Sequence, residues 1–193
     1  MDLNVFEELS QKYEIRKLQK GETVKSFDCG DADLNDFILN EAPHYRKSLL
    51  AVTYVIIPRE AANADHIVAF FSLSNDTVSI TNFTNKTEFN RFRKHRFVNE
   101  KRLKTYPAVK VGRLGIDKTV QGKGFGSFLL EFIKTYFLDE NKTGCRFITI
   151  DAYSDVVSFY LKNEFTPLTA DDIDAPTRLL YFDLADICDD FGE

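Results

Sequence analysis

The amino-acid sequence predicts a mixed α/β fold, with an antiparallel front half and a βαβ unit behind it, in one domain that spans residues 1–193. Three observations support this. Two segments rich in β-branched and aromatic residues follow each other closely enough to form a hairpin. A long helical pattern then lies between two apolar strand patterns, which is the order of a βαβ unit. With 193 residues, 44% of them hydrophobic, the chain can bury one sizeable core.

Composition narrows the class of protein. The net charge of −5 is too mild to indicate a partner by itself. Three cysteines (Cys29, Cys145 and Cys188) are widely spaced, with no Cys/His ligand pattern, so we expect a reducing compartment, no disulfide framework and no metal. The first ten residues lack an apolar signal core, and the longest apolar run, Leu49–Ile57, is too short to cross a membrane. These features favour a cytoplasmic protein without a membrane segment.

The front half begins with an alternating strand pattern at Tyr13–Gln19. Asp31 or Asp33 can then cap a helix, and Pro43 interrupts or restarts it, so two short helices are expected. Leu49–Ile57 and the segment 66–80 form the expected antiparallel hairpin.

The back half contains the remaining elements. They are a basic stretch (Lys86–Pro107), a strand (Ala108–Asp117), a long amphipathic helix (Gly126–Leu138), a strand (Cys145–Tyr153), a short helix capped by Ser154 or Asp155, and a last strand (Arg178–Ile187). The right-handed crossover rule places the long helix across one face of the sheet.

Glycines at alternate positions, Gly122, Gly124 and Gly126, separate a strand from the long helix. Their spacing matches neither the P-loop nor the dinucleotide fingerprint. Glycines nevertheless allow successive main-chain amides to turn inward, and the start of a helix attracts anions. Lys123 adds a positive charge. The turn therefore suits a pyrophosphate, although a plain strand-to-helix connection could have the same sequence pattern.

The surroundings of the turn add a resemblance. The segment "QGKGFG" (Gln121–Gly126) fits the pattern Q/R-x-x-G-x-G/A, and it follows "VGRLGID" and precedes a helix of suitable length. Together with "IDAYSDVVSFYLKNEF" downstream, these motifs resemble the GCN5-related N-acetyltransferase (GNAT) family. That resemblance implies the GNAT fold, with a central mixed twisted sheet of six to seven strands flanked by helices.

The resemblance also implies a donor and its binding residues. Acetyl-CoA would be the acyl donor, with its pantetheine arm along the main chain of Leu114, Gly115 and Ile116. The turn would hold its pyrophosphate through Gln121, Gly122, Lys123, Gly124, Phe125, Gly126 and Ser127. The apolar side chains of Leu114 and Ile116 can serve core packing at the same time, because the implied contacts use backbone atoms.

Tyr160 occupies the position of the family's tyrosine general acid. A phenol with an ordinary pKa near 10 stays protonated at neutral pH and can donate to the departing sulfur. Without the resemblance, a packed aromatic beside Phe159 would be the better interpretation. No general base stands out, since Asp117, Asp151, Asp155 and Glu164 are all explained equally well as strand ends and helix caps. The lack of a clear base mildly favours an α-amine as the acceptor, because an amine with a pKa near 8 is already partly neutral at pH 7.

The front half resembles a narrower group. "FDCGDADLNDFILNEA", with "VGRLGID" and the glycine turn, looks like the tRNA-acetylating toxins of toxin–antitoxin systems. This likeness implies an aminoacyl-tRNA acceptor and a ribbon-helix-helix antitoxin as partner, and it leaves a homodimer open.

The basic stretch gives this acceptor physical support. Between Lys86 and Pro107 eight cationic side chains oppose two glutamates, with Phe89, Phe92, Phe97 and Tyr106 interleaved. Arg93, Lys94 and Arg96 are the candidate RNA contacts. The alternative is an amphipathic helix with its phenylalanines inward and its charges in water, and the acidic character of the whole chain favours it slightly.

Three functions stay open at this stage. The first is an N-acetyltransferase for aminoacyl-tRNA, and the second an N-acetyltransferase for a protein or small-molecule amine. The third is a non-catalytic module that binds acyl-CoA.

Overall fold

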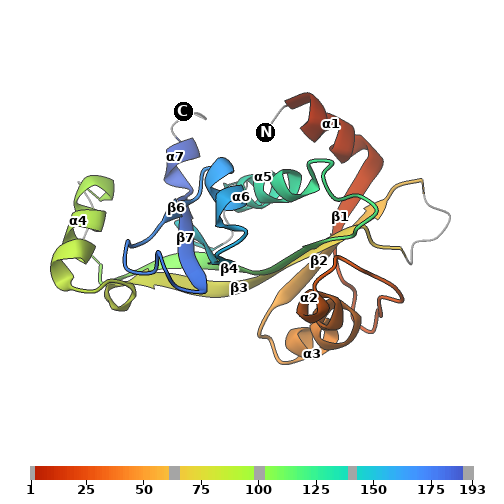
Figure 1. The fold of residues 1–193 in the computed structure, drawn as a ribbon, viewed down its shortest axis with the longest axis horizontal. Helices are drawn as coiled ribbons and strands as arrows, with labels where there is room; N and C mark the ends of the chain where they lie inside the picture. The colour runs from red at the N-terminus through yellow and green to blue at the C-terminus, as the bar shows by residue number, and fades with distance from the viewer. Residues whose placement is uncertain (1–2, 61–65, 98–102, 139–142, 189–193) are drawn as a thin grey trace. The chain divides into compact units, whose positions relative to one another are not determined.

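The computed structural model describes residues 3–60, 66–97, 103–138 and 143–188. Seven strands form one mixed sheet in the order β1-β2-β3-β4-β5-β7-β6 (Figure 1). The strands are β1 (Tyr13–Lys17), β2 (Val52–Pro58), β3 (Ala69–Ser79), β4 (Thr105–Ile116), β5 (Phe147–Tyr153), β6 (Thr166–Pro167) and β7 (Thr177–Asp183). The mixed sheet flanked by helices confirms the predicted fold class.

The helices follow the same chain order. They are α1 (Leu3–Lys12), α2 (Ala32–Asp36), the π-helical turn η1 (Phe37–Glu41), α3 (Ala42–Lys47), the 3₁₀ turn η2 (Ile80–Asn82), α4 (Lys86–Arg96), α5 (Phe125–Leu138), α6 (Val157–Lys162) and α7 (Ala185–Cys188). Among the described residues, no helix combines the length and hydropathy that a membrane span requires.

Contacts divide the chain into two compact units. The first contains residues 1–74 and 111–136, and the second contains residues 75–110 and 137–193. Strands β3 and β4 each contribute to both units. The single domain expected from length and composition stays a prediction, and each unit is described separately below.

In the first unit, helices cover both faces of the β1-β2-β3 hairpin region. Val55 and Phe70 point to the side of η1, where they pack with the fully buried Phe37. Tyr54 and Phe71 point to the opposite side and stack on each other, with ring centroids 4.9 Å apart. There Phe71 meets Phe132 of α5 at 6.1 Å. Alternation along a strand separates the two sets of side chains, as a half-turn per residue requires.

Local sequence explains the helices of this unit. Asp31 is the N-cap of α2, and its side chain accepts a hydrogen bond from Leu34 N. Pro43 lies in the first turn of α3, where a missing N–H is tolerated, so it restarts the helix as expected. The π-helical turn between the two helices was not predicted. Helix α1 was not predicted either, since its segment is rich in charge and polar residues.

In the second unit, β4 and β5 run parallel, with Ala108–Lys110 beside Phe147–Thr149, whereas β5 and β7 pair antiparallel. Strand β4 precedes α5 in the chain and β5 follows it, so their parallel pairing confirms the expected βαβ order. One face of the sheet carries a cluster in which Phe147 and Tyr181 pack with Phe89 and Phe92 of α4. On the other face, Phe182 meets Phe165 at a ring distance of 5.8 Å, and Phe165 meets Tyr160 of α6 at 5.9 Å.

Two element boundaries in this unit differ from the prediction. Helix α6 begins at Val157, and its N-cap is Val156, which makes no side-chain capping bond, so neither Ser154 nor Asp155 is the cap. The last strand ends at Asp183 rather than at Ile187, because α7 begins two residues later. The side chain of Asp183, 1% exposed, accepts bonds from Ala185 N and the Arg146 guanidinium, which fixes this transition.

Candidate acyl-CoA site

The glycine turn connects the end of β4 to the start of α5 within the first unit. Gly122 and Gly124 have φ values of +75° and +83°, a left-handed conformation that L side chains rarely adopt. Phe128 N donates to Gly124 O at 3.0 Å and begins the helix. No main-chain N–H from Gly122 to Ser127 has an acceptor among the described residues. Six consecutive amides are thus available at a helix N-terminus, the arrangement that suits a pyrophosphate.

Close packing explains the glycine at position 115, in the strand before the turn. A Cβ at Gly115 would lie 2.6 Å from Phe70 Cε1 and 3.2 Å from Phe27 Cζ. Such a contact is shorter than any real Cβ makes, so glycine lets β4 lie against the core at this point. Leu114 and Ile116 are half-buried, as expected for side chains that pack while their backbone serves another purpose.

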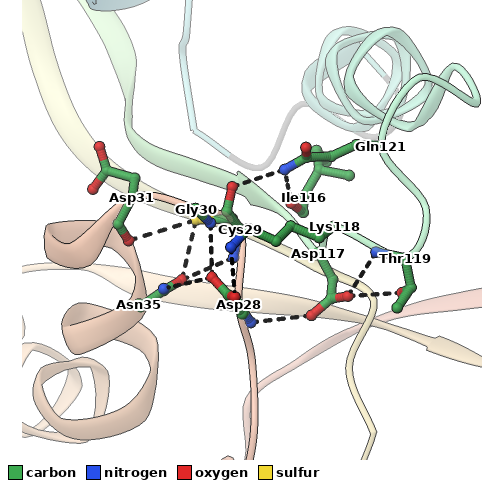
Figure 2. Close-up of polar contacts among 10 residues, drawn as sticks. All are labelled: Asp28, Cys29, Gly30, Asp31, Asn35, Ile116, Asp117, Lys118, Thr119 and Gln121. Carbon is green, nitrogen blue, oxygen red and sulfur yellow. Dashed lines mark hydrogen bonds and ion pairs between the residues drawn. The ribbon is translucent and has the colours of Figure 1, made fainter.

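A network of polar contacts attaches the turn to the loop after Phe27 (Figure 2). Gln121 Nε2 donates to Cys29 O at 2.8 Å and to Ile116 O at 2.9 Å. Lys118 N donates to Asp28 O at 2.9 Å. Both hydrogens of the Gln121 amide nitrogen are therefore used by main-chain acceptors. In this structure Gln121 fixes the turn, and a direct contact from Nε2 to a cofactor would require one of these bonds to break.

Asp117 is the buried centre of this network, with 6% of its surface exposed. Its carboxylate accepts hydrogen bonds from Asp28 N at 3.1 Å, Thr119 N at 3.0 Å and Thr119 Oγ1 at 2.7 Å. Burial acts to raise the pKa of Asp117, but these hydrogen bonds outweigh it, and the pKa lies below its ordinary value. A carboxylate held by three donors is a structural anchor, and this accounts for one of the four acidic candidates for a base.

Asp28 and Asn35 complete the network from the front half. Asp28 accepts from Lys118 Nζ at 2.7 Å, from Gly30 N at 2.9 Å and from Asn35 Nδ2 at 3.1 Å. The Lys118 bond is the main reason that the pKa of Asp28 falls to about 2. Sequence reasoning missed both residues as parts of the site. Their place in the "FDCGDADLN" segment, beside the resemblance, was the signal that could have found them.

The two cysteines whose side chains the structure describes, Cys29 and Cys145, show no sign of nucleophilic chemistry. Cys29 Sγ lies 3.2 Å from Asn35 Oδ1, and burial raises the pKa of its thiol. Burial also raises the pKa of Cys145 to about 11. Both thiols therefore stay protonated at neutral pH, whereas a nucleophilic cysteine needs a lowered pKa.

Tyr160 lies on α6 in the second unit, 8% exposed. Its ring contacts Phe159 at 5.0 Å and Phe165 at 5.9 Å. None of the described residues makes a hydrogen bond with its hydroxyl group. Desolvation raises the pKa of Tyr160 to about 12, so the phenol stays protonated over the whole physiological range. The aromatic packing explains the ring, and it leaves the hydroxyl group available for a ligand.

The basic stretch forms α4 and the chain after it, of which residues 98–102 lie outside the described part. Asn85 caps the helix through bonds from Thr87 N and Glu88 N. Phe89, Phe92 and Phe97 are buried, as the amphipathic alternative predicts. Arg96 donates to Tyr181 Oη and Phe92 O, and it lies 3.4 Å from Asp183.

The three proposed RNA contacts therefore differ in their surroundings. Arg93 donates to Asn90 Oδ1 at 2.6 Å and to Leu103 O at 3.1 Å, so it and Arg96 already have partners within the second unit. Lys94 is exposed, and no described residue pairs with it. If RNA binds here, Lys94 is the contact among the three that requires no internal bond to break.

Solved structures with the same fold include several toxins. A tyrosine-to-phenylalanine mutant of KacT matches with a TM-score of 0.73 at 21% identity, over 93% of this chain and 99% of that one. AtaT complexed with acetyl-methionyl-tRNAfMet matches with a TM-score of 0.69 at 19% identity, over 93% and 99%. AtaTR bound with AcCoA gives 0.71 at 19%, over 94% and 99%. The chain has the GNAT fold.

No family model matches the sequence. The GNAT fold is therefore recognised from structure, at identities that carry the fold and not the activity. Within this fold, the glycine turn follows the fourth strand and opens the helix before the fifth, in agreement with the order that the motifs predicted.

Proposed function

We propose that this protein transfers an acetyl group from acetyl-CoA to a primary amine. The observation that carries the proposal is the run of six unpartnered amides at the start of α5, in a chain with the GNAT fold. Free N–H groups and the dipole at a helix N-terminus favour an anion such as pyrophosphate, and Lys123 lies among these amides. AtaTR, which has this fold, was solved with AcCoA bound.

The reaction needs few protein groups. The amine nitrogen attacks the thioester carbonyl carbon, the new C–N bond forms, and the C–S bond breaks as the tetrahedral intermediate collapses. The nitrogen loses a proton to water, and CoA leaves as a thiolate. No covalent intermediate on the protein is required, which agrees with the two protonated thiols.

We propose that the hydroxyl group of Tyr160 acts on the sulfur atom of the departing CoA. With a pKa of about 12, its phenol is a weaker acid than a thiol, whose ordinary pKa is near 8.5. Complete proton transfer from tyrosine to the thiolate is therefore uphill. Tyr160 instead donates a hydrogen bond that stabilises the negative charge as it develops on sulfur, and solvent protonates CoA later.

The acceptor that we favour is the α-amino group of an aminoacyl-tRNA. AtaT, with the same fold over 93% of this chain, was solved with acetyl-methionyl-tRNAfMet. Asp117, one of the four carboxylates considered as a base, is fixed in the polar network, and Asp151 is ion-paired with Lys110. An α-amine is already partly neutral near pH 8, so it depends less on a base than a lysine does. A protein or small-molecule amine is the second candidate.

The same comparison supports an antitoxin partner. AtaT was solved bound to the C-terminus of the antitoxin AtaR, and KacTA in a complex with DNA. We propose a partner of this kind for the present chain, with a ribbon-helix-helix domain as the resemblance implies.

Acetyl transfer and acceptor choice are tested together. The protein is incubated with isotopically labelled acetyl-CoA and, separately, charged tRNAs, uncharged tRNAs, total protein and polyamines, and each fraction is analysed by mass spectrometry. We expect label on the amino acid of charged tRNA and none on uncharged tRNA. Label on protein or polyamines alone would show that the acceptor is one of these amines and not charged tRNA. Acetyl-CoA binding without label on any fraction would favour the non-catalytic module.

A further inference from the structure

Helix α1 packs directly against the proposed cofactor turn. Its segment was not predicted to be a helix, and neither its sequence nor the motifs of the turn connected the two. Val5, Phe6 and Leu9 form one face of the helix, which is half-buried to buried, while Glu7 and Glu8 are exposed. Apolar residues at this spacing identify a face that packs on a neighbour. All these residues and the turn belong to the first unit.

The contacts concentrate on the second glycine and the first turn of α5. A Cβ placed on Gly124 would lie 3.3 Å from Val5 Cγ1. The ring of Phe6 lies 5.2 Å from that of Phe128, and the ring of Tyr13, directly after α1, lies 4.8 Å from that of Phe125 in an edge-on arrangement. Val5 of α1 thus lies close enough that a side chain at Gly124 would press against it.

The other end of α1 is fixed to the sheet. Arg59, just after β2, donates from its main-chain N to Lys12 O at 2.9 Å and from Nε to Ser10 O at 3.3 Å. The helix therefore connects the hairpin to the cofactor turn, which it contacts at Gly124, whereas the loop that carries Asp28 contacts the turn at Lys118 and Gln121.

A glycine-rich turn needs such support. Glycine loses more conformational freedom on ordering than any other residue, and three glycines lie within five positions here. A turn that the cofactor itself must order binds more weakly than one that is already ordered. The contacts from α1 leave the amides of Gly122 to Ser127 without partners, so they support the turn without occupying its donors.

We propose that α1 is a positioning element of the acyl-CoA site: Val5 and Phe6 hold Gly124 and the first turn of α5 in the conformation that binds pyrophosphate. This inference rests on the proposed function. It assigns no contact between α1 and the cofactor. It predicts that loosening α1 weakens donor binding and leaves the chemical step unchanged.

The test compares the double variant Val5→Ala/Phe6→Ala with the wild type at a temperature well below both melting points. We expect the Kd and the KM for acetyl-CoA to rise about tenfold, which corresponds to about 1.4 kcal/mol, with kcat within twofold. Val78→Ala is the matched control, because it truncates a fully buried valine in the cluster of Phe89 and Phe147 in the second unit, which includes none of these contacts. It should lower the melting temperature and leave the KM unchanged.

The outcomes separate this inference from the proposed function. An unchanged Kd in the double variant would overturn the positioning role, and a lower Kd would show that α1 covers the site instead. An equal rise in the Val78→Ala control would show general loosening and also contradict it. Absence of acetyl-CoA binding by the wild type would overturn the proposed function, and the inference with it.

A measurement without cofactor tests the contact itself. Gly124→Ala should lower the melting temperature less in the Val5→Ala background than in the wild type, because part of its effect is the close contact with Val5. Additive effects would contradict the proposal whether or not acetyl-CoA binds.

Discussion

Replacement of Tyr160 by phenylalanine isolates the hydroxyl group that the mechanism uses. The ring contacts with Phe159 and Phe165 remain, and no described residue loses a hydrogen bond. We therefore expect the free energy of unfolding to change by less than about 0.5 kcal/mol. For a chain of this length, that corresponds to a melting-temperature shift of roughly 2 °C or less.

The effect on catalysis is expected to be much larger. Loss of one donor to a developing negative charge lowers kcat by about 10²–10³-fold, or about 2.7–4 kcal/mol. The assay is steady-state release of CoA with a saturating amine acceptor, combined with calorimetric binding of acetyl-CoA. The Kd for acetyl-CoA should stay within about twofold, because the hydroxyl group acts on the sulfur only as the bond breaks.

The matched control is Tyr153→Phe, which removes the same atom from a tyrosine that is 62% exposed at the end of β5. It should leave kcat and the Kd unchanged. A Tyr160→Phe variant with kcat within twofold of the wild type would refute the role of Tyr160, provided that the chemical step limits the wild-type rate. Equal losses in both variants would refute it as well.

Three further predictions concern the network, acid stability and α4. Gln121→Ala removes two bonds that fix the turn and should raise the KM for acetyl-CoA with little change in kcat, whereas Gln11→Ala on the exposed side of α1 should change neither. Asp28 and Asp117 have lowered pKa values in the folded state. Their contribution to folding stability is therefore present above the unfolded pKa near 3.9 and is lost as the pH falls toward about 2. The melting temperature of Asp28→Asn/Asp117→Asn should therefore depend less on pH than that of the wild type across this range, and an equal dependence would contradict the assignment. Lys94→Ala should weaken tRNA binding and reduce the salt dependence of that binding without lowering stability. Arg96→Ala should lower stability, because it removes a partner of Asp183. An unchanged tRNA affinity in Lys94→Ala would favour α4 as a purely structural helix.

Most of the sheet and the long helix could be predicted from the sequence, because their patterns are regular. The alternation in Tyr13–Gln19 and the three- and four-residue spacing in Gly126–Leu138 match β1 and α5 closely. Pro43 and Asp31 act through local chemistry, which is also readable from the chain. Strand β6 has two residues, and no periodic pattern can be recognised over that length.

The support of the candidate site was less accessible to sequence reasoning. Asp28 and Asp117 lie 89 positions apart, and a single sequence carries no signal for such a pair. Gln121 was predicted as a cofactor contact from its motif, but whether its amide faces a ligand or the main chain depends on the loop beside it. Helix α1 is stabilised by packing on α5 rather than by its own sequence, so its polar composition concealed it.

The basic stretch shows how one pattern supports two interpretations. Charges alternate with phenylalanines both in a surface that binds RNA and in an amphipathic helix. The buried rings of Phe89 and Phe92 explain the apolar half of the pattern. The cationic half divides between side chains with internal partners, such as Arg96, and exposed ones, such as Lys94, and only binding measurements with RNA test the latter.

The central claim is that the amides at the start of α5 bind acetyl-CoA for transfer to an amine. Its most direct test is the mass spectrum of a charged-tRNA pool after incubation with labelled acetyl-CoA and either wild-type protein or Tyr160→Phe. We expect labelled N-acetyl-aminoacyl-tRNA to form with the wild type, and its initial rate of formation to fall to at most about one hundredth with the variant. Label on no acceptor, or equal label with both proteins, would contradict it.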